Sequence, residues 1–356
     1  MTDADHWSGD LLGVDDLLRS TEDDPGSDDD GARRRRRWGR VAVQASVAVL
    51  ALLVLGAAGL LWTVTNSVTG SVRTVPVGAL AAGSGDTAGK PLALLLLGSD
   101  LRLGPDQTDG VSGQRADAIM LIRFNAERTR IDVLSIPRDS WVPIPGKRTE
   151  KINASLGGGP SLVVRTVQQL TGMTINHVMV MDFDGVRDLT TALGGVTVTN
   201  EHAITDPRNG NHFDAGPITL SGDRALLYVR IRYGLPGGDF DRIAHQQQVV
   251  DAISQKLRSE DVLGKPLLAE HVVRIVAQNL TVDSGLDTAA MTQLLVDILS
   301  TPPAGVHFYT APSAGFGRSA DGQSYVKLDM RSLAAATAAM KADKPVPLKG
   351  TPITVP

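Results

Sequence analysis

Arginines and aspartates are the residues of this chain whose types and spacing could do chemistry. They recur beside short apolar runs, in Asp100-Leu101-Arg102, Arg115-Ala116-Asp117, Pro137-Arg138-Asp139 and Arg230-Ile231-Arg232. Guanidinium groups match phosphate oxygens and stay charged at any working pH. A group of them therefore indicates a polyanionic ligand.

Asp100 and Asp117 indicate a role beyond anion binding. Carboxylates could hold Mg²⁺ against a diphosphate, or one of them could accept a proton from an attacking hydroxyl group. Each short motif, taken alone, is more often a solvated surface pair, and it is their conjunction that favours chemistry. The residues by themselves leave both roles open.

Hydrophobic patterning predicts the elements that position these residues. The continuous apolar run at 91–99 predicts a buried central strand. Residues 117–125 alternate, and 130–136 form a further strand that ends at Pro137. Because the turn between these two segments is short, they are predicted to pair as a hairpin.

The clearest amphipathic helix is predicted at 239–257, where Asp239 suits the positive end of the helix dipole. Arg242 and Gln246 are four residues apart and so share one face of this helix. The other predicted helices cover residues 160–172, 184–195, 266–279, 287–299 and 329–341. The remaining predicted strands are 176–183, 196–200 and 305–311.

Strands that alternate with helices predict the α/β class, with a mixed central β-sheet flanked by helices on both faces. Residues 221–232 begin as a helix and pass into a strand or turn. Residues 201–220, which place His202 and His212 among Pro and Gly, are predicted to form a loop. An open α/β sheet usually binds ligands at its strand ends, and the arginines and aspartates are predicted to lie there.

Residues 41–64 carry no charge and predict one N-terminal transmembrane helix, long enough for a hydrocarbon core of about 30 Å. Arg33–Arg37 precede this span, so the N-terminus is expected in the cytoplasm and the rest of the chain outside. A cleaved signal peptide, the alternative, would need a shorter leader. The sequence thus predicts a single-pass protein of the cell membrane with an extracytoplasmic domain.

The chain divides further by composition. Residues 1–40 predict a disordered tail with acidic and basic segments. Residues 65–90, rich in Gly, Ser, Thr and Ala, predict a linker. A single folded domain is expected at 91–343, followed by a disordered Pro-containing tail at 344–356.

Composition also excludes several classes of function. The chain has no cysteine, so disulfides, Cys-ligated zinc and thiol nucleophiles are excluded. Residues 41–356 contain equal numbers of acidic and basic side chains. A nucleic-acid-binding domain would be basic, so no nucleic-acid partner is expected.

Six segments, in their order and spacing, resemble the LytR-CpsA-Psr family. They are LLLLGSDLR, RADAIMLIRFN, VLSIPRDSWVPIPG, KINASLGGGP, MVMDFDGVRDLTTALGGVTV and LLYVRIRYGLPGGDFDRIAHQQQV. The resemblance implies transfer of a phosphorylated glycopolymer from a polyprenyl-pyrophosphate carrier to peptidoglycan, outside the cell. It also implies that the prenyl tail lies in an apolar tunnel between the sheet and the helices.

The resemblance assigns roles to individual residues. It places the family's acidic pair on Asp100 and Asp117, as catalytic residues and as ligands of Mg²⁺ or Mn²⁺. Arg138 is expected both in catalysis and in pyrophosphate binding. The matched pyrophosphate-binding positions are Arg115, Arg138, Arg230, Arg232, Arg242 and Gln246.

One position departs from the family pattern. The family often has arginine immediately before the glutamine of the helix motif, where this chain has His245. Two interpretations stay open: the histidine weakens one phosphate contact or makes it dependent on pH, or it is a residue on the helix surface.

Two other functions are compatible with parts of the sequence. A polyprenyl-pyrophosphate hydrolase would use the same residues with water as the acceptor. A non-enzymatic lipid-binding or regulatory membrane protein would need the arginines, but a pure anion-binding pocket would avoid the two aspartates.

Overall fold

The computed structural model describes residues 73–80, 89–99 and 116–350 of the protein. The predicted membrane span at 41–64 lies outside these ranges. Within them, no helix combines the length and the apolar character that crossing a bilayer requires.

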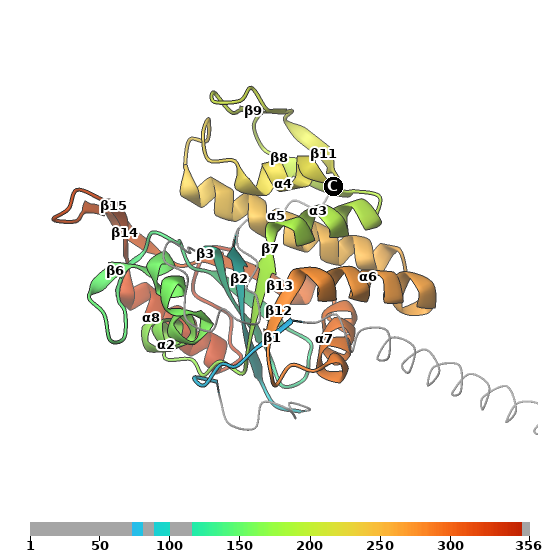
Figure 1. The fold of residues 1–356 in the computed structure, drawn as a ribbon, viewed down its shortest axis with the longest axis horizontal. Coiled ribbons are helices and arrows are strands. Elements are labelled where there is room, and N and C mark those ends of the chain that lie inside the picture. The colour runs from blue at the N-terminus through green and yellow to red at the C-terminus, as the bar shows by residue number, and fades with distance from the viewer. Residues whose placement is uncertain (1–72, 81–88, 100–115, 351–356) are drawn as a thin grey trace, which may run out of the picture. The chain divides into compact units, whose positions relative to one another are not determined.

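A mixed seven-stranded sheet forms the centre of the described chain, in the order β1-β12-β7-β2-β3-β4-β13 (Figure 1). Its strands are β1 (Arg73–Val75), β2 (Leu92–Ser99), β3 (Ala116–Phe124), β4 (Ile131–Ser135), β7 (His177–Asp182), β12 (Leu280–Asp283) and β13 (Val306–Thr310). Strand β2 pairs parallel to β7 and antiparallel to β3. The β3–β4 hairpin is antiparallel, as predicted. The predicted mixed sheet is therefore confirmed.

Helices cover both faces of this sheet, which confirms the prediction (Figure 1). They are α2 (Pro160–Thr171), α3 (Phe183–Ala192), α4 (Asp223–Arg230), α5 (Asp239–Ser259), α6 (Pro266–Asn279), α7 (Thr288–Ser300) and α8 (Met330–Lys341). Leu95 of β2 belongs to the core under α2 and α8. Its neighbour Leu94 belongs to the core under α7. Successive strand side chains point to opposite faces, so one apolar strand supplies both cores.

A third apolar core joins α3, α4, α5 and α6 to two small two-stranded sheets. The strands beside this core are β8 (Val196–Asn200), β9 (Ile204–Thr205), β10 (His212–Phe213) and β11 (Gly216–Leu220). Strand β8 pairs with β11, and β9 pairs with β10. The prediction of a loop at 201–220 was therefore wrong. Ile204, Phe213 and Leu220 are buried in this core, and the strands are too short for their alternation to stand out.

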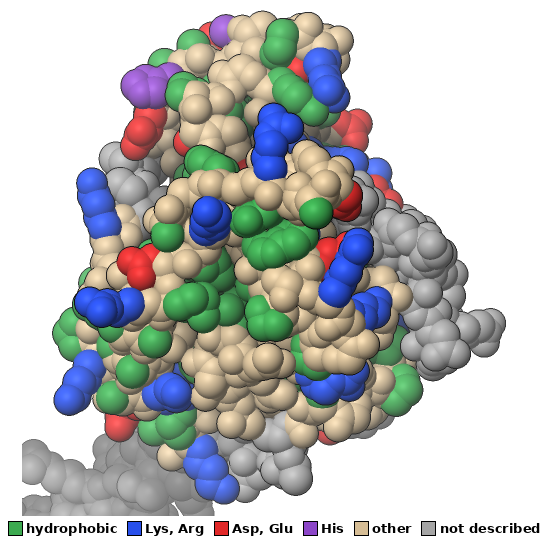
Figure 2. Space-filling model, turned by 90° about the vertical axis from the view of Figure 1, so that its left-hand side faces the viewer, with side chains coloured by type: hydrophobic (Ala, Val, Ile, Leu, Met, Phe, Trp, Pro, Cys, Tyr) green, Lys and Arg blue, Asp and Glu red, His purple; other side chains and the backbone are tan. Residues whose placement is uncertain are grey.

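Two more hairpins were not predicted. They consist of β5 (Trp141–Pro143) with β6 (Thr149–Lys151), and of β14 (Ser313–Arg318) with β15 (Ser324–Leu328). Trp141 stacks on Tyr325 with ring centroids 4.5 Å apart, which joins the two hairpins. The β14–β15 hairpin projects to the left in Figure 1. Figure 2 views that side, where hydrophobic side chains gather among Lys and Arg side chains.

The domain extends beyond both predicted boundaries. Residues 73–75, predicted as part of the linker at 65–90, form β1, which pairs parallel to β12. Val346, in the tail predicted to be disordered at 344–356, is buried against the core under α2 and α8. Single apolar side chains among polar or proline neighbours anchor both segments, and composition averages do not reveal them.

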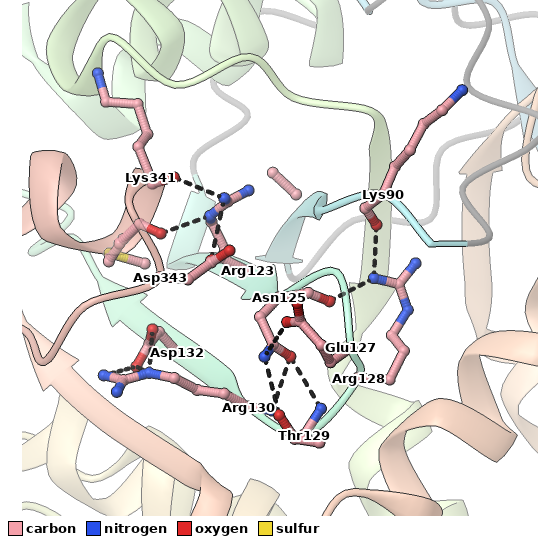
Figure 3. A network of polar contacts seen from close by, with 12 residues as sticks. Lys90, Arg123, Asn125, Glu127, Arg128, Thr129, Arg130, Asp132, Lys341 and Asp343 are labelled. Atoms are coloured by element: carbon pink, nitrogen blue, oxygen red, sulfur yellow. Dashed lines mark hydrogen bonds and ion pairs between the residues drawn. The ribbon is translucent and has the colours of Figure 1, made fainter.

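The end of the sheet at the β3–β4 turn is closed by a polar network (Figure 3). Oδ1 of Asn125 accepts hydrogen bonds from the backbone N–H groups of Thr129 and Arg130, each at 2.9 Å. Arg123 donates hydrogen bonds to the backbone oxygens of Met340 and Lys341. These are carbonyl groups in the last turn of α8, which have no partner within the helix. This network fixes the hairpin register at the sheet end opposite to the start of β3.

Short 3-10 helices complete the described chain, at η1 (Ile152–Gly158), η2 (Val262–Gly264) and η3 (Pro303–Gly305). Helix α2 shows why the longer helices could be predicted. Pro160 lies at its first turn, and Gly172 ends it in the left-handed region with a φ of 63°.

Candidate functional site

Asp117, at the start of β3, is the residue on which three of the predicted arginines converge. Nη1 of Arg138, just after β4, donates a hydrogen bond to Oδ1 of Asp117. Nη2 of Arg232, just after α4, lies 3.3 Å from the same oxygen. Nη2 of Arg242, in the first turn of α5, donates to the backbone oxygen of Asp117 at 3.1 Å. The fold thus brings together residues from four separate segments of the chain.

Asp239, the first residue of α5, is a second carboxylate within this cluster. Its Oδ1 lies 2.7 Å from Nη2 of Arg242 and 3.7 Å from Nε of Arg138. Burial raises the pKa of Asp239, although Arg242 and Arg138 oppose that rise. The sequence indicated only a helix-start residue here, and the Asp-x-x-Arg spacing was the signal for an ion pair on one helix face.

Arg242 is a buried cation, with only 2% of its side chain exposed. Burial lowers the pKa of its guanidinium to about 10, so the group is still charged at neutral pH. Asp239 raises that pKa, whereas Arg138 and Arg232 lower it. A further anion beside these three arginines would relieve their mutual repulsion.

Unused hydrogen-bonding capacity in the cluster also points to a ligand. Within the described part of the chain, the buried Nε atoms of Arg138 and Arg242 have no hydrogen-bond partner. A buried donor without a partner costs about 1–3 kcal/mol. An anion with several oxygens would satisfy such donors.

A cavity of about 310 Å³ opens beside the cluster. Its lining consists of Asp117, Asp206, Arg208, Asn209, Val229, Arg230, Arg232, Tyr233, Arg242 and Gln246. Four arginines and two aspartates give this lining a net positive charge. We call it the cationic cavity, and its charge and size suit a diphosphate group.

An apolar cavity of about 190 Å³ adjoins the cationic one and shares Val229 and Gln246 with it. It lies between β2, β3 and β7 of the sheet and helices α3 and α5. The other lining residues are Leu96, Leu97, Gly98, Ala118, Met120, Met181, Asp182, Val186, Leu189, Val249, Val250 and Ile253. The sequence did not identify these residues as a cavity lining, because that lining depends on which side chains of α5 face the sheet.

Gln246 is fixed between the two cavities. It is 6% exposed, and its Nε2 donates to the backbone oxygen of Val229 at 3.4 Å. Arg230, at the end of α4, is exposed and lines the cationic cavity. Asp100 and Arg115 lie outside the described residues, so their predicted roles remain predictions.

His245 does not lie on the helix surface, which was one of its two predicted roles. It is buried, and its ring stacks on Tyr228 with centroids 4.2 Å apart. Burial lowers the pKa of His245 to about 4, so the imidazole is neutral at physiological pH. It does not line the cationic cavity. The helix-surface interpretation was therefore wrong, because the neighbouring helix α4 covers this position. A weakened phosphate contact stays a prediction.

Sequence reasoning also missed Asp206, Arg208, Asn209 and Tyr233 as cavity residues. The first three come from the segment predicted as a loop. Its Asp-Pro-Arg-Asn-Gly sequence is typical of a tight turn, and this was the one signal of an ordered structure there. Among the described residues, no three His, Asp or Glu side chains come close enough together to hold a metal ion.

Comparisons with known proteins agree with this arrangement. The chain matches the LytR_cpsA_psr family over residues 66–342. It is 30% identical to the polyisoprenyl-teichoic acid–peptidoglycan teichoic acid transferase TagU of Enterococcus faecalis over 290 residues, 81% of this chain and 91% of that protein. TagU of Bacillus mycoides is 36% identical over 203 residues, which are 56% of this chain and 63% of that relative.

A solved structure supports the same fold. The structure of TagT bound to LI-WTA has a TM-score of 0.59 and is 25% identical in sequence. The likeness covers 76% of this chain and 98% of that one. The strand-and-helix arrangement described above is therefore shared along most of the folded domain.

Proposed function

Because the chain belongs to the LytR-CpsA-Psr family, we propose that it is an enzyme that transfers a phosphorylated glycopolymer from a polyprenyl-diphosphate carrier to peptidoglycan. Relatives are named as transferases that join polyisoprenyl-linked teichoic acid to peptidoglycan. One observation carries the proposal for this chain: the cationic and apolar cavities adjoin and share Val229 and Gln246. A lipid diphosphate has the same division into charged and apolar parts.

The donor would lie across both cavities. Its prenyl chain would extend between the sheet and α5, where burial of each CH₂ group contributes about 0.8 kcal/mol. Its diphosphate oxygens would accept hydrogen bonds from Arg138, Arg232 and Arg242. Arg230 would lie at the mouth of the cationic cavity. Arg115 would join them from the segment outside the described residues. Gln246, at the junction, would mark the boundary between tail and head.

The reaction is a substitution at the phosphorus atom that carries the glycopolymer. An acceptor hydroxyl oxygen on peptidoglycan forms the new P–O bond, and the bond to the bridging oxygen breaks. Polyprenyl phosphate leaves as an anion and needs no strong general acid. The hydroxyl proton passes to a carboxylate, for which Asp117 is the candidate among the described residues and Asp100 the second. Arg138 contacts Asp117 and would stabilise charge on the transferring group.

Of the two predicted metal ligands, Asp117 lies among the described residues and could bind a divalent cation. The two arginine contacts to the Asp117 carboxylate both use Oδ1, and a carboxylate has further acceptor capacity on its second oxygen. Asp117 and Asp100 would hold Mg²⁺ or Mn²⁺ together with diphosphate oxygens. The ion would neutralise charge on the diphosphate as the bridging bond breaks.

The expected location fits this chemistry. A single helix at 41–64 would hold the domain at the outer leaflet, where a lipid-linked donor is available. Membrane, lipid-linked polymer and peptidoglycan would then be the three partners, and no nucleic acid is involved.

A transfer assay tests the proposal. Full-length protein in lipid nanodiscs is given a radiolabelled polyprenyl-diphosphate-linked oligosaccharide, with and without peptidoglycan sacculi. We expect label in the sacculi and one polyprenyl phosphate released per transfer. Asp117→Asn should lose at least about 100-fold in rate, because a positioned proton acceptor contributes about 10²–10⁴-fold.

The sacculus-free reaction separates the alternatives. Release of free sugar phosphate at the same rate without sacculi would identify a hydrolase instead. Undiminished transfer by the Asp117→Asn protein would contradict the assigned role of Asp117.

A further inference from the structure

One part of the lining of the cationic cavity has no role in the chemistry above. Arg208 and Asn209, which follow β9, and Tyr233, which follows Arg232, belong to this part of the wall. None of the three lines the apolar cavity. The β9–β10 hairpin that carries the first two lies beyond α4 and α5 from the central sheet (top of Figure 1).

Arg208 and Tyr233 form a stacked pair. The guanidinium carbon of Arg208 lies 3.6 Å from the centre of the Tyr233 ring. Arg208 is exposed, and Tyr233 is 40% exposed. Such stacking restrains an otherwise flexible arginine and leaves its edge N–H groups able to donate hydrogen bonds.

The turn that presents Arg208 is itself fixed. Oδ1 of Asp206 accepts the backbone N–H of Arg208 at 2.9 Å, and its backbone oxygen accepts the N–H of Gly210 at 2.9 Å. Asp206 is buried although it lies in a turn. Its carboxylate is therefore used to hold the backbone of the turn at the cavity edge.

The hairpin also packs directly on the loop that carries Tyr233. Gly234 has a φ of +78°, and a Cβ added there would lie 2.3 Å from the backbone oxygen of Thr205. Only glycine permits this close approach. The hairpin with Arg208 and the loop with Tyr233 are thus held together by a backbone contact as well as by the stacked side chains.

From this geometry we infer that Arg208, Asn209 and Tyr233 form the subsite for the first sugar of the donor. The inference rests on the proposed function and deepens it. In the donor, the diphosphate lies between the prenyl chain and the sugar. With the prenyl chain in the apolar cavity and the diphosphate beside Arg232 and Arg242, the sugar would meet the lining residues that the cationic cavity does not share with the apolar one.

The chemistry of this wall suits a sugar. A guanidinium and an amide donate hydrogen bonds to hydroxyl and acetamido oxygens, and an aromatic ring contacts the apolar face of a pyranose. A sugar that lacks a hydroxyl group recognised here would leave donors unpaired, which is a strong basis for discrimination. These residues therefore select the sugar of the donor, and they do not hold the reacting phosphorus.

Paired ligands test the subsite. Binding of geranylgeranyl diphosphate, and of the same lipid diphosphate carrying one of a panel of hexoses or N-acetylhexosamines, is measured by calorimetry on the full-length protein. Arg208→Ala and Tyr233→Ala should bind the sugar-free lipid as the wild type does. Both should weaken binding of the preferred sugar-bearing lipid about tenfold. Arg208→Ala removes one hydrogen bond from a charged group, and Tyr233→Ala removes the ring that contacts the sugar and restrains Arg208.

Arg224→Ala is the matched control, because Arg224 is also an exposed arginine over an aromatic ring, 4.9 Å from the centre of Phe213. It does not line the cationic cavity. An equal effect of Arg224→Ala, or unchanged binding of every sugar-bearing lipid by Arg208→Ala and Tyr233→Ala, would overturn the subsite. Failure of the wild type to bind the sugar-free lipid would instead reject the proposed function.

Discussion

At the residue scale, the site depends on arginines held by two carboxylates. Asp117 contacts Arg138 and Arg232, and Asp239 contacts Arg242. These aspartates balance the cations while no anion is bound, and they keep the guanidinium groups oriented toward one place. A diphosphate would enter a site whose donors are already positioned, which lowers the cost of ordering side chains on binding.

Arg242→Lys should therefore weaken lipid-diphosphate binding about 10- to 100-fold, although charge is conserved. A lysine cannot contact Asp239 and the backbone of Asp117 together with a phosphate in a planar fork. Isothermal titration with geranylgeranyl diphosphate measures the change. Arg274→Lys is the control, since Arg274 pairs with Glu270 on the exposed side of α6. Equal affinities of the Arg242→Lys and Arg274→Lys proteins would refute this role.

His245 gives a prediction about stability and pH. The folded-state pKa is lowered to about 4 from 6.5, so the unfolded chain binds the proton first as the pH falls. Stability from the neutral ring is then present above about pH 6.5 and is lost toward pH 4, by up to about 3 kcal/mol.

His245→Phe keeps a ring against Tyr228 but has no titrating group. Urea unfolding of both proteins across this pH range should show a smaller loss of stability for the variant. Parallel pH profiles for the two proteins would contradict a buried neutral histidine.

The meeting of Arg138, Arg232 and Asp117 could be predicted from the sequence, because each follows or precedes a recognisable strand or helix. The roles of Asp239 and His245 could not. Their burial depends on how α4 packs on α5 and on Arg138, which lies about a hundred positions earlier in the sequence. Periodicity along one helix does not show which neighbour covers it.

At the element scale, the β9–β10 hairpin and the loop after α4 form one wall of the site. Gly234→Ala should destabilise the domain by about 2 kcal/mol or more, because the new Cβ meets the backbone of Thr205 and the φ is positive. Gly210→Ala has a similar φ of +73° but open space around it, so it should cost about 1 kcal/mol. Urea unfolding compares them, and equal losses would mean that the close approach does not constrain this wall.

Long, strongly patterned elements were predicted well, including β2, α2 and α5. Several short ones were not: β12 has four residues and pairs with β7 about a hundred positions earlier in the chain. Such strands are specified by tertiary partners rather than by local pattern. The same reason explains why β9, β10 and β11 escaped prediction, and with them the sugar-binding wall.

At the scale of the whole molecule, the proposal requires that the domain and the N-terminus lie on opposite sides of a membrane. The chain has no cysteine, so single cysteines can report sidedness. Ala320→Cys, at the exposed tip between β14 and β15, should react with a membrane-impermeant maleimide on intact cells. Ser8→Cys should react only after the membrane is permeabilised. Labelling in the reverse order would contradict the proposed topology.

A crystal structure of the protein with a bound polyprenyl diphosphate would test the two-cavity site most directly. We expect the diphosphate in contact with Arg138, Arg232 and Arg242, and the prenyl chain in the apolar cavity between β2, β3 and α5. A diphosphate bound away from these arginines, or a prenyl chain outside that cavity, would contradict the two-cavity site.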